Sequence, residues 1–167
     1  MSHHRSFKLW FVPLIAALVA TLVAASVFVG AASAKAGGPL HITVSPKFEF
    51  TSFNCPAADL CFATFTGDVR SNLSTSAGRV DGFLVLTPVN GSFEPCNHVS
   101  EYPVFTFPEG TISVHSEHTD CPAWIRPGPR IDTEFQVTGG TGTFSGATGG
   151  GSEIGGASIV YNGTISF

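Results

Sequence analysis

Apolar and polar residues alternate with a period of two along much of the chain after residue 35. The clearest case ends the chain, where one side of the run 159–167 carries Ile159, Tyr161, Gly163, Ile165 and Phe167. Successive side chains of a β-strand point to opposite faces, so this pattern predicts a half-buried strand. Related runs predict further strands over 41–50, 61–70, 79–88, 102–107, 111–118, 131–138 and 149–156.

These segments are joined by turn-forming residues, and no window after residue 35 shows a helical stripe of apolar residues. Asn-Gly pairs start at 90 and 162, and Pro-Glu-Gly starts at 108. The pattern predicts an all-β domain, a single antiparallel closed barrel of eight strands, with a β-sandwich as the alternative. Closure would remove exposed strand edges. Because proline cannot donate to a strand ladder, we expect the segment 102–107 near an edge or a bend.

Residues 1–34 have the layout of a secretory signal peptide. Arg5 and Lys8 precede a long apolar run, and Ala32, Ser33 and Ala34 form an A-x-A-like cleavage site. An uncleaved membrane anchor is the alternative, since about 20 apolar residues can span a bilayer. Under either interpretation the single domain 35–167 is exported. We expect it to be secreted, extracellular or in the cell envelope. It would contact the membrane only through an uncleaved signal segment.

Charge and cysteine content narrow the partners of this domain. Without Arg5 and Lys8, the domain has six basic and twelve acidic residues. This formal charge of −6 disfavours nucleic acid as a partner.

The four cysteines predict two disulfides. Of the three possible pairings, loop closure favours Cys55 with Cys61 and Cys96 with Cys121. His115, His118 and Cys121 lack the tight paired spacing of zinc ligands, so we predict no metal site.

The stretch VTGGTGTFSGATGG, residues 137–150, has the look of a glycine loop for a dinucleotide. A G-x-G-x-x-G fingerprint would need a glycine at position 145, which is Ser145, and the stretch lies too near the C-terminus for a nucleotide-binding sheet to follow. We therefore expect no cofactor and no dinucleotide. The stretch predicts a structural turn between two strands, built from Gly139, Gly140, Gly142, Phe144 and Gly146.

The string VTGGTGTFSGATGGG, with YNGTISF at the C-terminus, resembles the glycine-rich turn and closing strand of the allene oxide cyclase-like and dirigent-like β-barrel superfamily, in particular its small exported bacterial members. The resemblance covers about the last forty residues. It implies an eight-stranded antiparallel barrel with a central cavity, assembly as a homotrimer, and confinement of an unsaturated substrate without a metal. No catalytic carboxylate of the plant families can be matched to a residue of this chain.

No catalytic motif identifies an activity, so the catalytic residues stay unknown. The titratable candidates, most of which the alternation places on the solvent face, are Glu49, Asp68, Asp81, Glu117, Asp132, Glu134, His41 and His115. The favoured hypothesis is a non-catalytic binding or structural module for a small hydrophobic ligand or an envelope partner. The alternative is a cofactor-free cyclase or isomerase that confines its substrate. A cavity of about 300 Å³ or more with a carboxylate or histidine inside would favour the enzyme.

Overall fold

A computed structural model describes residues 37–45, 47–122, 125, 130–156 and 158–167. The predicted signal peptide, residues 1–34, lies outside the described residues. Among the residues that are described, no helix is long and apolar enough to cross a membrane. The elements are strands apart from one short 3-10 turn: β1 (Gly38–Val44), β2 (Glu49–Ala57), β3 (Leu60–Ser71), β4 (Gly78–Val89), β5 (Ser92–Phe107), β6 (Gly110–Asp120), β7 (Ile131–Gly140), η1 (Gly142–Phe144), β8 (Thr148–Gly155) and β9 (Ile159–Ser166).

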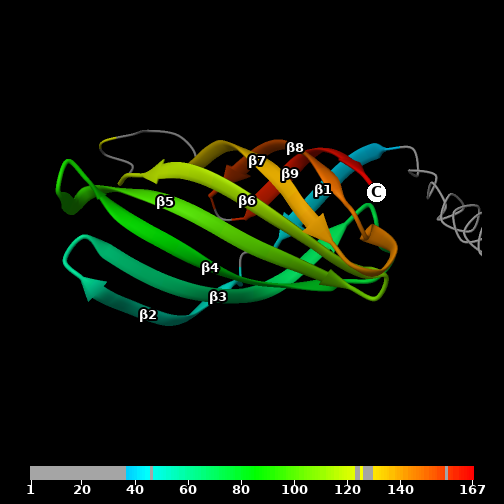
Figure 1. The fold of residues 1–167 in the computed structure, drawn as a ribbon, viewed down its shortest axis with the longest axis horizontal. Coiled ribbons are helices and arrows are strands. Elements are labelled where there is room, and N and C mark those ends of the chain that lie inside the picture. Colours follow the sequence, from blue (N-terminus) through cyan, green and yellow to red (C-terminus); the bar gives the residue numbers. More distant parts are fainter. Residues whose placement is uncertain (1–36, 46, 123–124, 126–129, 157) are drawn as a thin grey trace, which may run out of the picture. The chain divides into compact units, whose positions relative to one another are not determined.

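The strands form one antiparallel sheet that closes into a barrel (Figure 1). The sheet order is β1-β9-β8-β7-β6-β5-β4-β3-β2, and an additional pairing of β1 with β3 joins its two ends. The closing contact is short, with Ile42 opposite Ser71 and Val44 opposite Val69. This closed antiparallel barrel of eight strands, β1 and β3 to β9, confirms the predicted fold class and rules out the sandwich alternative.

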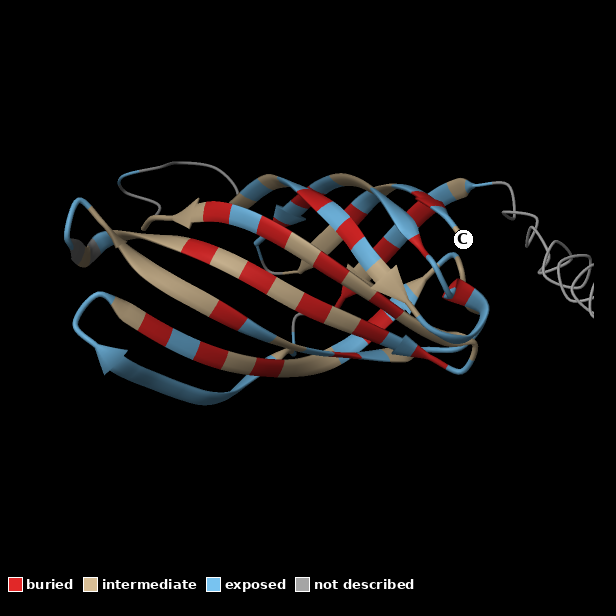
Figure 2. Ribbon diagram, viewed as in Figure 1, coloured by how far each residue is buried: buried red, intermediate tan, exposed pale blue. Residues whose placement is uncertain are grey.

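The predicted strand 41–50 is two strands, which is a correction to the sequence analysis. After Val44 the chain leaves its place between β9 and β3, and it resumes as β2, which pairs along the other part of β3. β2 is exposed along its whole length, whereas β3 alternates between buried and exposed residues (Figure 2). The barrel therefore carries a ninth strand that adds to the sheet outside the closed ring.

The barrel interior is filled by the apolar side of the alternating strands. Its largest completely buried side chains include Tyr161, Phe105 and Phe135, whose rings meet edge to face with centroids 5.1 and 5.4 Å from Tyr161. Edge-to-face packing suits the charge distribution of aromatic rings. The three rings form one packed cluster inside the barrel, and Tyr161 also lines the cavity.

The segment 102–107 does not lie at an edge, which is one of the two positions that we expected for it. It belongs to β5, a strand of 16 residues between β4 and β6. Pro103 is paired with Gly82 of β4. On the side of β6 it has no paired residue, because the pairs there are Glu101 with Ser116 and then Val104 with Ser113. The missing proline N–H thus coincides with an interruption of one ladder, so it does not force the strand to the edge.

The glycine-rich stretch lies in the turn that joins β7 to β8. β7 ends at Gly140, η1 follows, and the side chain of Phe144 is buried against Phe107 and Phe167. Gly142 and Gly146 both have positive φ, which a residue with a side chain rarely adopts. The turn thus closes one end of the barrel with an aromatic plug.

Candidate functional site

A cavity of about 240 Å³ lies inside the barrel. Most of its lining is apolar and comes from strands far apart in the sequence, including Val44, Phe65, Leu84 and Ile159. The titratable residues of the lining are Glu101, His118, Asp120, Arg130 and Tyr161. The volume is below the 300 Å³ set as a threshold above, but a carboxyl and an imidazole both line the cavity. It suits a small, mainly apolar molecule with a few polar atoms.

Two buried glutamates interact inside the barrel, and one of them, Glu101, lines this cavity. Glu101, on β5, is 6% exposed, and Glu153, on β8, is completely buried. Their electrostatic interaction and a hydrogen bond between the two side chains both act on the pKa of Glu101. Burial of two acidic residues next to each other destabilises a fold, so a buried pair of acids indicates a functional site.

The two carboxyl groups differ in what surrounds them. Burial raises the pKa of Glu101 well above its ordinary value, and the charge of Glu153, a hydrogen bond to Glu153 and the charge of Asp120 raise it further. Burial also raises the pKa of Glu153, but hydrogen bonds from Ser116, Tyr161 and Glu101 lower it in part. The pair therefore holds on to a proton at a pH at which exposed glutamates are ionised, because burial raises the pKa of both carboxyl groups.

Two hydroxyl groups lie near the buried carboxyl group of Glu153. Tyr161 stands directly opposite it on β9, and Ser116 of β6 is also buried. Among the described residues neither carboxylate oxygen of Glu153 has a hydrogen bond of standard geometry, although both hydroxyls lie near enough to lower its pKa. Burial and the neighbouring glutamates raise the pKa of Tyr161 well above 10.0, so its phenol stays a neutral hydrogen-bond donor.

A histidine completes the group on the cavity side. His118 lies on the inward face of β6, and its Nε2 is 4.0 Å from Oε1 of Glu101. Both side chains are almost completely buried, at 5% and 8% exposed. An imidazole and a carboxyl group beside one cavity can both exchange protons with a bound molecule. We call Glu101, His118, Glu153 and Tyr161 the acid cluster.

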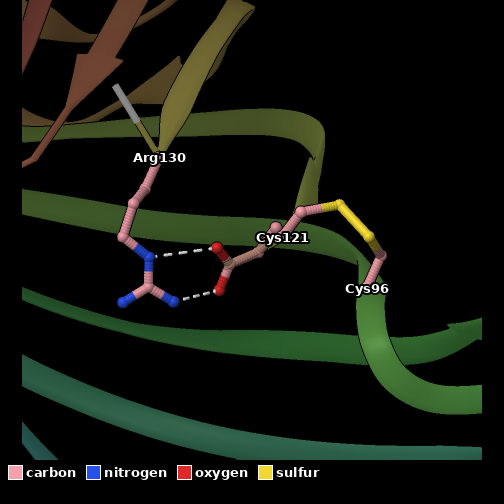
Figure 3. Close-up of a disulfide and its surroundings, with 4 residues drawn as sticks. Cys96, Cys121 and Arg130 are labelled. Atoms are coloured by element: carbon pink, nitrogen blue, oxygen red, sulfur yellow. Dashed lines mark hydrogen bonds and ion pairs between the residues drawn. A yellow bond between two sulfur atoms is a disulfide. The ribbon is translucent and has the colours of Figure 1, made fainter. Parts of the chain in front are cut away.

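An ion pair marks the outer part of the cavity, where β6 ends. Arg130 donates from Nε and Nη2 to the two carboxylate oxygens of Asp120, at 3.1 and 2.6 Å. The Cys96–Cys121 disulfide follows directly on Asp120 and ties the end of β6 to β5, next to Arg130 (Figure 3). The bidentate geometry fixes the guanidinium with both partner oxygens in use.

The sequence-derived candidates do not form this site. The acidic candidates Glu49, Asp68, Asp81, Glu117, Asp132 and Glu134 and the histidine His41 are exposed, and His115 stacks on Tyr102 outside the cavity. The residues that do meet in the barrel were missed. One signal was present: Val99, Glu101, Phe105 and Phe107 share one parity on β5, as do Val114 and His118 on β6.

The two disulfides join Cys55 to Cys61 and Cys96 to Cys121, the pairing that loop length favours. Two disulfides are consistent with an oxidising compartment outside the cytosol. In the described part of the chain, no group of three or more histidine, cysteine, aspartate or glutamate residues is arranged to hold a metal ion.

Comparison with known proteins gives a fold neighbour and no family. No protein-family model matches the chain, and no curated protein matches it. The solved structure of a pyocyanin demethylase is similar to this chain with a TM-score of 0.52 and 16% sequence identity, over 78% of this chain and 99% of that one. At this identity the likeness shows the barrel fold alone, and that neighbour is an enzyme.

Proposed function

We propose that the protein is an exported, cofactor-free acid–base catalyst that binds a small, mainly apolar molecule in its barrel and moves a proton between two of its atoms. The observation that carries the proposal is the buried pair of Glu101 and Glu153, in which burial raises the pKa of both carboxyl groups and Glu101 lines the cavity. Isomerisation or ring closure of an unsaturated molecule is the reaction class that such a site supports.

Glu101 is the proton donor in this proposal. Its carboxyl group lines the cavity and stays protonated at a pH at which an exposed glutamate is ionised. Acid catalysis is most effective when the pKa of the donor lies near the working pH. Glu153 is a positioning residue in this proposal, because it is completely buried, does not line the cavity and raises the pKa of Glu101 through its charge.

His118 is the proton acceptor. Its imidazole lines the same cavity as Glu101, so one bound molecule can contact both groups. Proton transfer from the ligand to His118, and from Glu101 to a second atom of the ligand, leaves the composition of the ligand unchanged. The proton then returns from His118 to Glu101. Because Nε2 of His118 and Oε1 of Glu101 are 4.0 Å apart, this return needs only a small movement or one bridging water molecule. No external oxidant or reductant is needed.

The comparison supports the proposal in two limited ways. The neighbouring fold belongs to an enzyme named for action on pyocyanin, so this barrel can carry catalysis on a small organic molecule. The resemblance of the glycine-rich turn to cyclase-like barrels also agrees with a confined substrate. Pyocyanin is therefore one ligand to test for binding and conversion.

A direct test uses 5-nitrobenzisoxazole, a flat probe whose ring opens when a base removes its C–H proton, breaking the N–O bond and releasing a coloured phenolate. We expect the purified protein to accelerate this reaction over buffer. His118→Gln should lower the rate at least about tenfold, since it removes the base, and Glu101→Gln should lower it and change its pH profile. Glu134→Gln, an exposed glutamate on β7, is the matched control.

The outcomes separate two functions. Equal rates in the wild type, His118→Gln and Glu101→Gln would contradict the catalytic proposal. If pyocyanin or another apolar molecule binds in the barrel and none is converted, the protein is instead a non-catalytic binding module, the hypothesis that the absence of catalytic motifs favours.

A further inference from the structure

The cavity continues onto an exposed row of phenylalanines outside the closed barrel. Phe48 precedes β2, while Phe50 and Phe53 lie on it, and we call these three residues the aromatic strip. Phe48 and Phe50 line the cavity. Phe50 is 59% exposed and Phe53 is 67% exposed. Large aromatic side chains exposed side by side on one strand indicate a surface that binds something.

The register of β2 places this row on the face that continues the barrel lining. Phe50 stands opposite Phe65 and Phe53 stands opposite Ala63, both of which are buried inward-facing residues of β3. Residues directly opposite in an antiparallel pair share one face of the sheet. An extra residue at Thr51, between the pairs of Phe50 and Ser52, is what brings both phenylalanines to the same face.

The inner part of the strip is already built into the barrel. Phe48 packs edge to face on both Phe50 and Phe65, with ring centroids 5.6 and 6.5 Å apart. Gly67 of β3 leaves the room for it, since a side-chain carbon there would come within 2.9 Å of Phe48. The strip therefore begins on the packed cavity wall, and Phe53 extends it outward on the same face of the sheet.

We infer that the aromatic strip is an outer subsite of the same cavity, and that the ligand is a flat, elongated, apolar molecule whose outer part lies on Phe50 and Phe53. This inference rests on the proposed binding function of the barrel. A cavity of about 240 Å³ encloses only a small molecule, and the rings next to its lining offer apolar surface for a longer one. Glu49, the one charged residue of β2, is opposite Thr66 and so lies on the other face.

Two ring systems of equal width and different length test this subsite: quinoline, with two fused rings, and acridine, with three. We expect both to bind the wild-type protein in a fluorescence titration. The double variant Phe50→Ala/Phe53→Ala should bind acridine about tenfold more weakly and quinoline about threefold more weakly, because quinoline can contact Phe50 at the cavity lining and only the longer molecule also reaches Phe53. Both side chains are exposed, so the fold should keep its thermal midpoint within a few degrees.

Phe83→Ala is the matched control, because Phe83 is 44% exposed and stacks on Tyr102 away from the cavity. Equal losses of the two probes, or no loss, would overturn the subsite while leaving the barrel as a binding site. Failure of both probes to bind the wild type would overturn the binding function itself. If the double variant instead dissociates an oligomer in sedimentation and still binds acridine normally, the strip is a contact between copies of the chain.

Discussion

Glu153 on β8 stands in register with Tyr161 on β9, and both side chains are buried in the barrel. The tyrosine ring packs against Phe105 and Phe135, so its position is set by aromatic contacts. Its hydroxyl group lowers the pKa of the facing carboxyl, which burial raises. The apolar core thus positions a hydrogen-bond donor for the acid cluster, which links the stability of the barrel to its proposed chemistry.

Tyr161→Phe should raise the pKa of Glu153 further. The substitution keeps the ring and its packing and removes the hydroxyl group, so the ionised carboxylate loses one stabilising donor. Titration of the glutamate side-chain carboxyl carbons by NMR measures this shift. Tyr102→Phe, on the outer face beside Phe83, should leave the Glu153 titration unchanged. An unchanged Glu153 pKa in Tyr161→Phe would show that the hydroxyl does not act on it.

The stability of the barrel should fall as pH rises above the ordinary range of a glutamate. Glu101 and Glu153 both have raised pKa values in the folded state, so between about 4.5 and those values the folded chain binds more protons than the unfolded chain. The contribution is fully present below the unfolded pKa and is lost as pH rises through the folded pKa, with a slope of up to about 1.4 kcal/mol per pH unit for each proton.

Urea unfolding from about pH 5 to about pH 8 measures this dependence. Glu101→Gln should make the slope shallower, because glutamine cannot ionise, and should make the protein more stable than wild type at the alkaline end. Glu134→Gln should retain the wild-type slope. A Glu101→Gln variant with an unchanged slope would mean that Glu101 does not hold the proton.

The outward position of Asp81, Asp132 and Glu134 could be predicted because each follows from the parity of one strand. The all-β barrel could be predicted from the number of strands and the turns that join them. The acid cluster could not, because it depends on register between strands. Glu153 lies in a glycine-rich strand whose parity is set by its pairing with β7 and β9. Glu101 was missed because the predicted strand 102–107 begins one residue after it, whereas β5 runs from Ser92 to Phe107.

The split of the predicted strand 41–50 was also beyond sequence patterns. Leu40, Ile42 and Val44 keep one parity and are buried, and Phe48 and Phe50 keep it too, which reads as one strand. The closed barrel divides this run into two strands. β1 pairs only with the part of β3 from Val69 to Ser71, so the rest of β3 can pair with β2. This division creates the aromatic strip.

Substitution by alanine should destabilise the fold at one of two adjacent glycines, Gly140, and have little effect at the other, Gly139. At Gly140 a side-chain carbon would lie 2.4 Å from the carbonyl oxygen of Phe144 and 2.7 Å from that of Thr111, so backbone would have to move. At Gly139 nothing lies within 4 Å. We expect Gly140→Ala to lower the free energy of unfolding by about 2–3 kcal/mol and Gly139→Ala to change it by less than about 0.5 kcal/mol, as measured by urea unfolding. Similar losses in both variants would mean that the turn does not approach β6 as closely as the structure shows.

The two disulfides should differ in their contribution to stability. Cys96 and Cys121 are separated by 25 residues and Cys55 and Cys61 by 6, so the first bond restricts the unfolded chain more. Loop-closure entropy gives about 3.5 kcal/mol for the first and about 2 kcal/mol for the second. Replacing each pair by serines and measuring urea unfolding without reductant compares them.

We expect the Cys96→Ser/Cys121→Ser variant to lose more stability and also to weaken binding in the barrel. Cys121 directly follows Asp120, whose carboxylate holds Arg130 at the outer part of the cavity, so release of the bond frees the end of β6. The Cys55→Ser/Cys61→Ser variant frees only the hairpin of β2 and β3, so quinoline affinity should stay near wild type. The reverse order of stability losses would show that the exposed hairpin, and not the long loop, governs unfolding.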